Sequence, residues 1–320
     1  MDTSGKRQRN TGIEALRGIG IIGIFLYHLF PSVFQGGFLG VPLFFVLSGY
    51  LMFVTSESRC KKGTFHIGSY YKKRFVKIFP PLFTMVVMVC CYLTLTNISR
   101  MSGMRQEICS IFLGYNNWWQ IKQNTSYFSK LTGASVFTHL WFLAVIVQLY
   151  IIWPFLFYFY KKGCQIIGGK KMCFLFLLLA VLSAGRMLFL YTPGEDPSRV
   201  YYGTDTMAFS LLIGVFLGAV RQQFHMRFTF TRKTLLALLS FCVLIICILF
   251  ITVNGQDQFL YQGGMFLISL FFAAIVSIME NHRQMVGELS GILWLSFLGE
   301  KSYGIYLWHY PIIVVAFMYY

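Results

Sequence analysis

Residues 17–31 read RGIGIIGIFLYHLFP, an apolar run with Arg17 at its start and His28 near its end. Arginine and histidine are costly in lipid and rare within membrane spans. In a helix, a separation of eleven positions brings both side chains to one face, about 16 Å apart along the axis. Glu14 lies one turn before Arg17, close enough to pair with it. We therefore expect this face to contact protein or water rather than lipid.

The rest of the chain has the composition of a membrane protein. Of its 320 residues, 57% are hydrophobic and 12% are charged, whereas soluble domains average about 25% charged. The sequence predicts an all-α, polytopic membrane bundle of about 9–11 spans in one domain, 1–320. No small-residue cleavage site follows the first apolar run, so its helix is expected to stay in the mature protein. The predicted spans are 13–31, 36–54, 78–96, 138–160, 172–191, 206–220, 234–253, 258–279 and 302–320.

The net charge of +16 is distributed unevenly between alternate connections. Such a bias predicts the membrane side of each loop, because Lys and Arg stay in the cytoplasm. We expect a multi-pass protein of a bacterial plasma membrane with a cytoplasmic N-terminus, and no nucleic-acid partner. The opposite loops hold 5 Lys and Arg, against 20 in segments 1–12, 55–77, 161–171, 221–233 and 280–301.

The residue types on the first helix indicate acyl or phosphate chemistry. Histidine can take a proton from a hydroxyl near neutral pH, and arginine binds phosphate or carboxylate. An acyl-CoA thioester, long and thin with phosphates at one end, would fit such a line of groups. Lys73, Arg74 and Lys77, in KKRFVKIFPP, either anchor the next span or form a second phosphate clamp. The Cys and His residues lack metal-ligand spacing, so no metal and no permanently bound cofactor are expected.

Six stretches together resemble the acyltransferase-3 family of membrane O-acyltransferases, and they follow the family's order. The resemblance runs from about residue 10 to 320 and is closest to the peptidoglycan O-acetyltransferase branch. The stretches are IEALRGIGIIGIFLYH, GGFLGVPLFFVLSGYLM, YYKKRFVKIFPPL, HLWFLAVIVQLYIIWP, RVYYGTDTMAFSLLIGVFLG and FLGEKSYGIYLWHYPIIVV.

The resemblance implies an O-acyltransferase that moves an acyl group, usually acetyl, from cytoplasmic acetyl-CoA to a hydroxyl of a cell-wall glycan such as peptidoglycan. His28 would be the essential histidine and Arg17 its motif partner. Tyr201 or Tyr202 would carry the acyl group, with Asp205 beside them. From the residues alone, a phenol can carry an acyl group if a base activates it, but an interfacial aromatic is an equal interpretation.

Other signature residues are weaker candidates. His139 and Trp141 belong to the His-Leu-Trp stretch. Ser302 and His309 share a helical face at about two turns, with Tyr303 and Tyr306 near them. For this last group we favour helix packing or tunnel lining over chemistry.

The sequence departs from the family pattern at two points. Ile146 and Val147 stand where many relatives have two acids, so any acceptor role of those acids is absent or moved. Relatives of this branch also often carry an extracellular SGNH-type domain, for which this sequence has no counterpart. Either a separate SGNH-type transferase is a partner, or the chain acts alone, or it is a fragment.

A second function class fits the same polar stripe. A transporter or flippase would also place Arg and His on a substrate path through the membrane. Such folds often contain inverted repeats or paired broken helices, and neither is evident here.

Overall fold

The computed structural model describes residues 10–128, 135–289 and 291–317, and every regular element in them is helical. This confirms the predicted all-α class. Three short 3-10 helices and a π-helical turn complete the set: η1 (Gly37–Leu39), η2 (Ile98–Met101), η3 (Thr138–Leu140) and η4 (Leu260–Gly264). The α-helices are α1 (Thr11–Leu29), α2 (Gly40–Lys61), α3 (Ile67–Thr96), α4 (Met104–Phe112), α5 (Asn116–Lys122), α6 (Trp141–Ile167), α7 (Gly169–Met172), α8 (Phe174–Leu190), α9 (Ser198–Tyr202), α10 (Thr204–Phe224), α11 (Arg232–Thr252), α12 (Met265–Asn281), α13 (Arg283–Gly287) and α14 (Ile292–Ala316).

Eight helical segments in the described part of the chain are long and apolar enough to cross a membrane. They coincide with the first eight predicted spans. The ninth, 302–320, lies on α14, which is not one of the eight, and its last three residues fall outside the described ranges.

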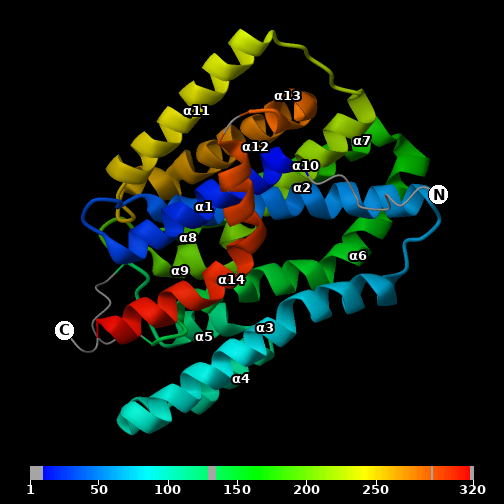
Figure 1. Ribbon diagram of the computed structural model, residues 1–320. Coiled ribbons are helices and arrows are strands. Elements are labelled where there is room, and N and C mark those ends of the chain that lie inside the picture. The colour runs from blue at the N-terminus through cyan, green and yellow to red at the C-terminus, as the bar shows by residue number, and fades with distance from the viewer. Residues whose placement is uncertain (1–9, 129–134, 290, 318–320) are drawn as a thin grey trace, which may run out of the picture.

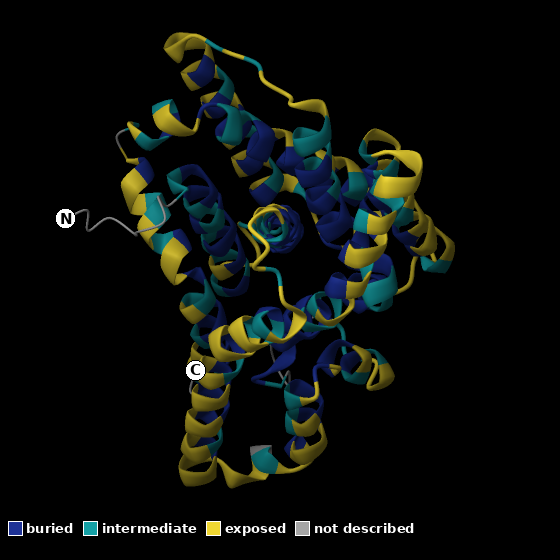
Figure 2. Cartoon of the chain, turned by 90° about the vertical axis from the view of Figure 1, so that its right-hand side faces the viewer, coloured by how far each residue is buried: buried dark blue, intermediate teal, exposed yellow. Residues whose placement is uncertain are grey.

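Helix α2 forms the centre of the bundle, with buried residues around its whole circumference. Figure 2 looks along it, with buried residues on the inner faces of the surrounding helices and exposed ones outside. Its packing against α10 depends on two glycines. A Cβ at Gly49 would overlap the Leu211 carbonyl oxygen, and one at Gly214 would overlap that of Val46. Small residues allow membrane helices to approach this closely.

Helix α14 runs alongside α1 and brings the C-terminal signature to the first helix. Gly299 meets the backbone at Glu14, where a Cβ would not fit. One α14 turn on, the Tyr303 hydroxyl donates to the Ile78 carbonyl oxygen of α3 at 2.7 Å. Further along, His309 reaches His28, with their ring centroids 5.4 Å apart. The α1–α14 contact therefore connects the first and the last of the six signatures.

The segment between α3 and α6 does not form a further span. Helices α4 and α5 are short and lie at the end of α3 that is remote from its basic residues (Figure 1). The segment nevertheless packs into the bundle, because Asn116, Asn117 and Gln120 of α5 are fully buried. This placement brings polar groups from a connection next to the ends of α1, α6 and α14.

Candidate active site

The polar stripe of α1 begins with an ion pair. The Arg17 Nη1 atom lies 3.1 Å from both carboxylate oxygens of Glu14, as the spacing predicts. Lys77 of α3 lies within electrostatic range of both members of this pair and of Arg74 on its own helix. The guanidinium of Arg74 stacks over the Tyr150 ring at 4.2 Å, a contact that fixes a planar cation. Three of the four predicted phosphate-binding cations thus lie together.

Lys73 is the fourth predicted phosphate-binding residue, and it lies on α3 next to Arg74. Its side chain is exposed, as is that of Lys77, whereas Arg17 and Arg74 are half-buried. The flexible ammonium of Lys73 is therefore free to reach a phosphate at the mouth of the bundle.

At the other end of the stripe, three histidines form a buried cluster. His28, His139 and His309 come from α1, η3 and α14, and all are buried. The ring centroid of His309 lies 5.4 Å from that of His28 and 5.6 Å from that of His139. The Tyr310 ring is close to two of these imidazoles, 4.8 Å from His28 and 4.9 Å from His139. We call these four side chains the histidine chamber.

The backbone of α14 fixes the tautomer of His309. Its Nδ1 lies 2.8 Å from the Tyr306 carbonyl oxygen and 3.2 Å from that of Ile305. Carbonyl oxygens only accept, so Nδ1 carries the proton and Nε2 of the neutral ring presents a lone pair. Within the part of the chain that the structure describes, that buried Nε2 has no hydrogen-bond partner, and neither do the two nitrogens of His139. Unpaired buried nitrogens are costly, and here they gather in one chamber.

The two signature tyrosines lie beside the chamber and differ in one contact. The Tyr201 hydroxyl donates to the Phe38 carbonyl oxygen at 3.1 Å. The Tyr202 hydroxyl is buried and has no hydrogen-bond partner among the described residues. Burial raises the pKa of both phenols well above the usual value, so each stays protonated until a base removes its proton. Of the two, Tyr202 has the hydroxyl available for reaction.

Aromatic rings connect these tyrosines to α1. Tyr127 is 4.8 Å from Tyr201 and 6.1 Å from His28, measured between ring centroids. Trp141 lies 4.8 Å from Tyr201 and 5.3 Å from Tyr202. The ring of Trp141 therefore packs both phenols in place.

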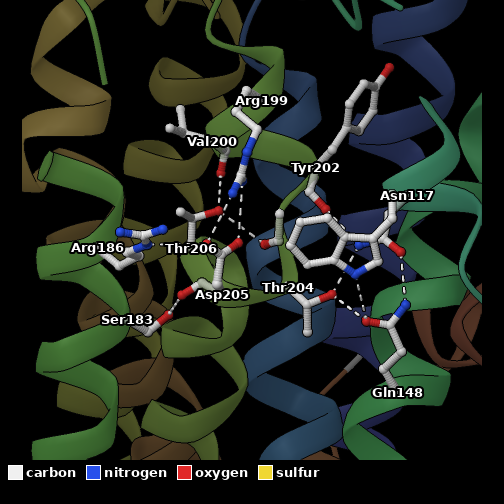
Figure 3. Close-up of polar contacts among 12 residues, drawn as sticks. Asn117, Gln148, Ser183, Arg186, Arg199, Val200, Tyr202, Thr204, Asp205 and Thr206 are labelled. Carbon is white, nitrogen blue, oxygen red and sulfur yellow. Dashed lines mark hydrogen bonds and ion pairs between the residues drawn. The ribbon is translucent and has the colours of Figure 1, made fainter. Parts of the chain in front are cut away.

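Asp205 holds the tyrosine segment in position. Its carboxylate accepts from Arg199 at 3.2 and 3.1 Å and lies 3.4 Å from the Nε atom of Arg186 (Figure 3). Arg199 belongs to the same short helix as Tyr201 and Tyr202, and Arg186 to the preceding long helix. The pairs tie α8, α9 and α10 together, so Asp205 has a structural role in this geometry.

An amide network supports the same turn from the other side (Figure 3). The Asn117 amide donates to the Tyr202 carbonyl oxygen at 3.0 Å and to the Thr204 hydroxyl at 2.9 Å. Gln148 donates in turn to the Asn117 side-chain oxygen at 2.8 Å. Gln148 follows Ile146 and Val147 on α6, the two positions at which many relatives have acids. In this chain α6 contributes the amide of Gln148 to the network.

Three weaker candidates of the last signature are held by packing or backbone contacts. The hydroxyl of Tyr303 is bound to α3, as described above, and Ser302 is buried within α14. Tyr306 donates to the backbone carbonyl oxygen of His139, which links α14 to η3. His309 is itself a member of the chamber, and the ring of Tyr306 lies 5.3 Å from that of His139.

Sequence reasoning missed one buried acid near the chamber, Glu107 of α4. Its carboxylate accepts from the Ser135 hydroxyl at 2.6 Å and from the Gln120 amide at 3.1 Å. Burial raises its pKa to about 7. It lies within electrostatic range of Tyr202 and Tyr310. The sequence signal that could have identified Glu107 is an acidic residue beside an aromatic, apolar segment that is too short to cross a membrane.

The described residues contain no group of three or more His, Cys, Asp or Glu side chains that could hold a metal ion. The chamber offers imidazole bases and phenols. Its unpaired nitrogens and the free Tyr202 hydroxyl suit proton removal from a hydroxyl followed by acyl transfer.

Comparisons with known proteins agree with this chemistry. The chain matches a family described as "Acyltransferase domain" over residues 10–320. It is 34% identical over 308 residues to the peptidoglycan O-acetyltransferase OatA of Listeria monocytogenes, covering 95% of this chain and 49% of the relative. It is 32% identical over 321 residues to the O-acetyltransferase OatA of Staphylococcus aureus, covering 97% of this chain and 51% of the relative.

The chain spans about half the length of these curated relatives. No solved structure matches it. The family match extends from α1 to the end of the chain and includes both ends of the polar stripe and the histidine chamber. The chain belongs to the acyltransferase-3 family.

Proposed function

We propose that the protein is a membrane O-acyltransferase that moves an acetyl group from acyl-CoA to a hydroxyl of a glycan outside the cell, with peptidoglycan as the acceptor. One observation carries the proposal. His28, His139 and His309 meet in a buried chamber beside a tyrosine whose hydroxyl has no partner. Two relatives named as O-acetyltransferases, one of them for peptidoglycan, support the acyl group and the acceptor.

The donor enters from the side of the basic loops. The uneven charge of the loops supports a cytoplasmic N-terminus in the plasma membrane. Arg17, Lys73, Arg74 and Lys77 then stand at the cytoplasmic end of α1 and α3 and bind the phosphates of acetyl-CoA. Glu14 orients Arg17 through their ion pair. The thin pantetheine arm extends along α1 toward His28.

The transfer itself proceeds in two steps. A chamber imidazole, with His28 as the primary base, takes the Tyr202 hydroxyl proton as the phenolate oxygen attacks the thioester carbonyl. The C–S bond breaks, the thiolate of CoA takes up a proton, and an O-acetyl tyrosine remains. A glycan hydroxyl, or an SGNH-type transferase that precedes it, then attacks this ester and restores the phenol. Tyr202 is the carrier because the Tyr201 hydroxyl is already bound to Phe38.

A matched pair of variants tests the carrier. The protein in nanodiscs is incubated with radiolabelled acetyl-CoA, and label bound to the protein is measured after denaturation. Tyr202→Phe should abolish the bound label, whereas Tyr201→Phe should retain it, because each substitution removes a single hydroxyl. Bound label that persists in Tyr202→Phe would exclude this tyrosine as carrier.

A further inference from the structure

A second basic site lies at the cytoplasmic end of the bundle, away from the polar stripe. An open cavity of about 560 Å³ is lined by the ends of α2, α10 and α12 and by the linker from α10 to α11. A neighbouring hollow of about 450 Å³ shares Lys61, Arg221 and Gln222 with it. This volume lies within the range of about 300–1,000 Å³ that is usual for small-molecule sites. We call the larger of the two the α10 cavity.

The α10 cavity carries an excess of positive charge. Its lining includes Lys61, Arg221 and Arg227, and its one carboxylate is Glu280. The Tyr50 hydroxyl donates to Glu280 at 2.9 Å, and Arg221 lies within electrostatic range of that hydroxyl. Glu280 is thus bound by the cavity wall, and two cations are left over.

The two remaining cations of the cavity are Lys61 and Arg227. Among the described residues, neither Lys61 nor Arg227 makes an ion pair, although Arg17, Lys161 and Arg199 each do. Glu57, in the adjoining hollow, offers no compensation, because Lys161 binds it at 3.1 Å and Gln222 at 2.6 Å. The cations lining the cavity outnumber the single described carboxylate, Glu280, so they repel each other, and an anionic ligand relieves that repulsion.

The third cation is held in place. Arg221 Nη1 donates to the Ser277 carbonyl oxygen of α12 at 3.1 Å, so its guanidinium has a fixed direction. Planar guanidinium groups bind phosphate through paired hydrogen bonds. His225 ends α10 in a left-handed conformation, with φ at 49°, and turns the linker so that Arg227 and Phe228 close the cavity. The lining therefore combines a fixed guanidinium, two mobile cations and an aromatic rim.

We propose that the α10 cavity binds a phosphate ester, separately from the Arg17, Arg74 and Lys77 cluster. The two sites share no residue, and they lie on different helices. The ligand is either a soluble phosphate ester, such as a nucleotide, or the headgroup of an anionic phospholipid, since the cavity lies at the ends of long apolar helices and is lined by basic residues. The inference goes beyond the proposed acyl transfer and does not depend on it.

Two binding experiments on the full chain distinguish these sources. In nanodiscs of phosphatidylcholine alone, titration calorimetry measures binding of adenosine 3′,5′-bisphosphate at low ionic strength, because salt screens such contacts. In detergent, native mass spectrometry measures how much added phosphatidylglycerol stays bound relative to phosphatidylcholine. The proposal predicts that one of these ligands binds the intact protein.

Charge-matched variants then locate the binding. Lys61→Gln/Arg227→Gln removes the two unpaired cations, and Arg221→Gln removes the fixed one. The control Lys162→Gln/Lys171→Gln removes two exposed cations from the same end of the bundle. Binding should weaken at least tenfold in the double variant of the cavity and in Arg221→Gln, and not in the control.

Two outcomes would overturn the proposal. In one, neither ligand binds the intact protein. In the other, the cavity variants and the control lose binding equally, as expected of diffuse surface charge. Acetyl-CoA consumption measured in the same preparations separates this result from the proposed function. If the protein consumes acetyl-CoA but binds neither ligand at the α10 cavity, only the phosphate-site proposal is refuted, and the proposed acyl transfer stands.

Discussion

The buried acid Glu107 makes a quantitative prediction about stability and pH. Its partners are neutral, Ser135 and Gln120, so burial raises its pKa from 4.5 to about 7. This difference in pKa corresponds to a pH-dependent change of about 3 kcal/mol in the free energy of unfolding, at about 1.4 kcal/mol per pKa unit. The native state binds the proton more tightly than the unfolded state does. The contribution of Glu107 to stability is therefore complete below pH 4.5 and is lost as the pH rises through 7.

Replacement by glutamine removes this loss, because the amide is neutral at every pH. Glu107→Gln should match the parent near pH 4.5 and exceed its stability by up to about 3 kcal/mol at pH 8. Unfolding in detergent, followed by circular dichroism from pH 4.5 to 8, measures the difference. Glu195→Gln, at an exposed position, is the control and should change little. If Glu107→Gln is less stable than the parent at pH 8, the carboxyl is ionised and well solvated, and the reasoning is wrong.

Three other variants test the packing and the site. Gly49→Ala should lower the free energy of unfolding by about 1–3 kcal/mol, because the new Cβ overlaps the α10 backbone. Gly185→Ala, a control with open space around the new Cβ, should raise the free energy of unfolding by up to about 1 kcal/mol. Thermal unfolding of the two variants measures both changes. Asp205→Asn should change the free energy of unfolding by less than about 1 kcal/mol. It should nevertheless lower acetyl labelling of the protein at least about tenfold, because it loosens the turn that carries Tyr201 and Tyr202. Labelling equal to that of the parent would contradict a positioning role for Asp205. Tyr303→Phe should cost about 1 kcal/mol of stability and leave acetyl-CoA consumption unchanged, and a large loss of activity would show that packing is not its role.

The sequence predicted the features that depend on one helix. Hydropathy located the eight long apolar helices, and helical spacing correctly paired Glu14 with Arg17. The positions of Arg17 and His28 on α1 follow from the same periodicity. Such features are local, because a repeat of 3.6 residues sets which side chains share a face.

The sequence did not predict how the histidines converge. His139 and His309 are far apart in the chain, and they meet because glycines allow α14 to lie against α1 and because Tyr306 binds the backbone at His139. Helical periodicity gives the face of each helix but not its partner. Glu107 was missed for the same reason, since its burial depends on α5 and Ser135 rather than on its own helix.

Consumption of acetyl-CoA by the intact protein and by His28→Ala tests the central claim most directly. Both proteins are reconstituted in nanodiscs with radiolabelled acetyl-CoA, and free acetate and protein-bound label are followed, with folding checked by circular dichroism. We predict that the intact protein consumes acetyl-CoA and that His28→Ala, although folded, does not. If His28→Ala transfers acetyl as fast as the intact protein, the histidine chamber is not the catalytic site. If neither protein consumes acetyl-CoA, the donor is wrong, and the stripe from Arg17 to His28 is better explained as the path of a transporter.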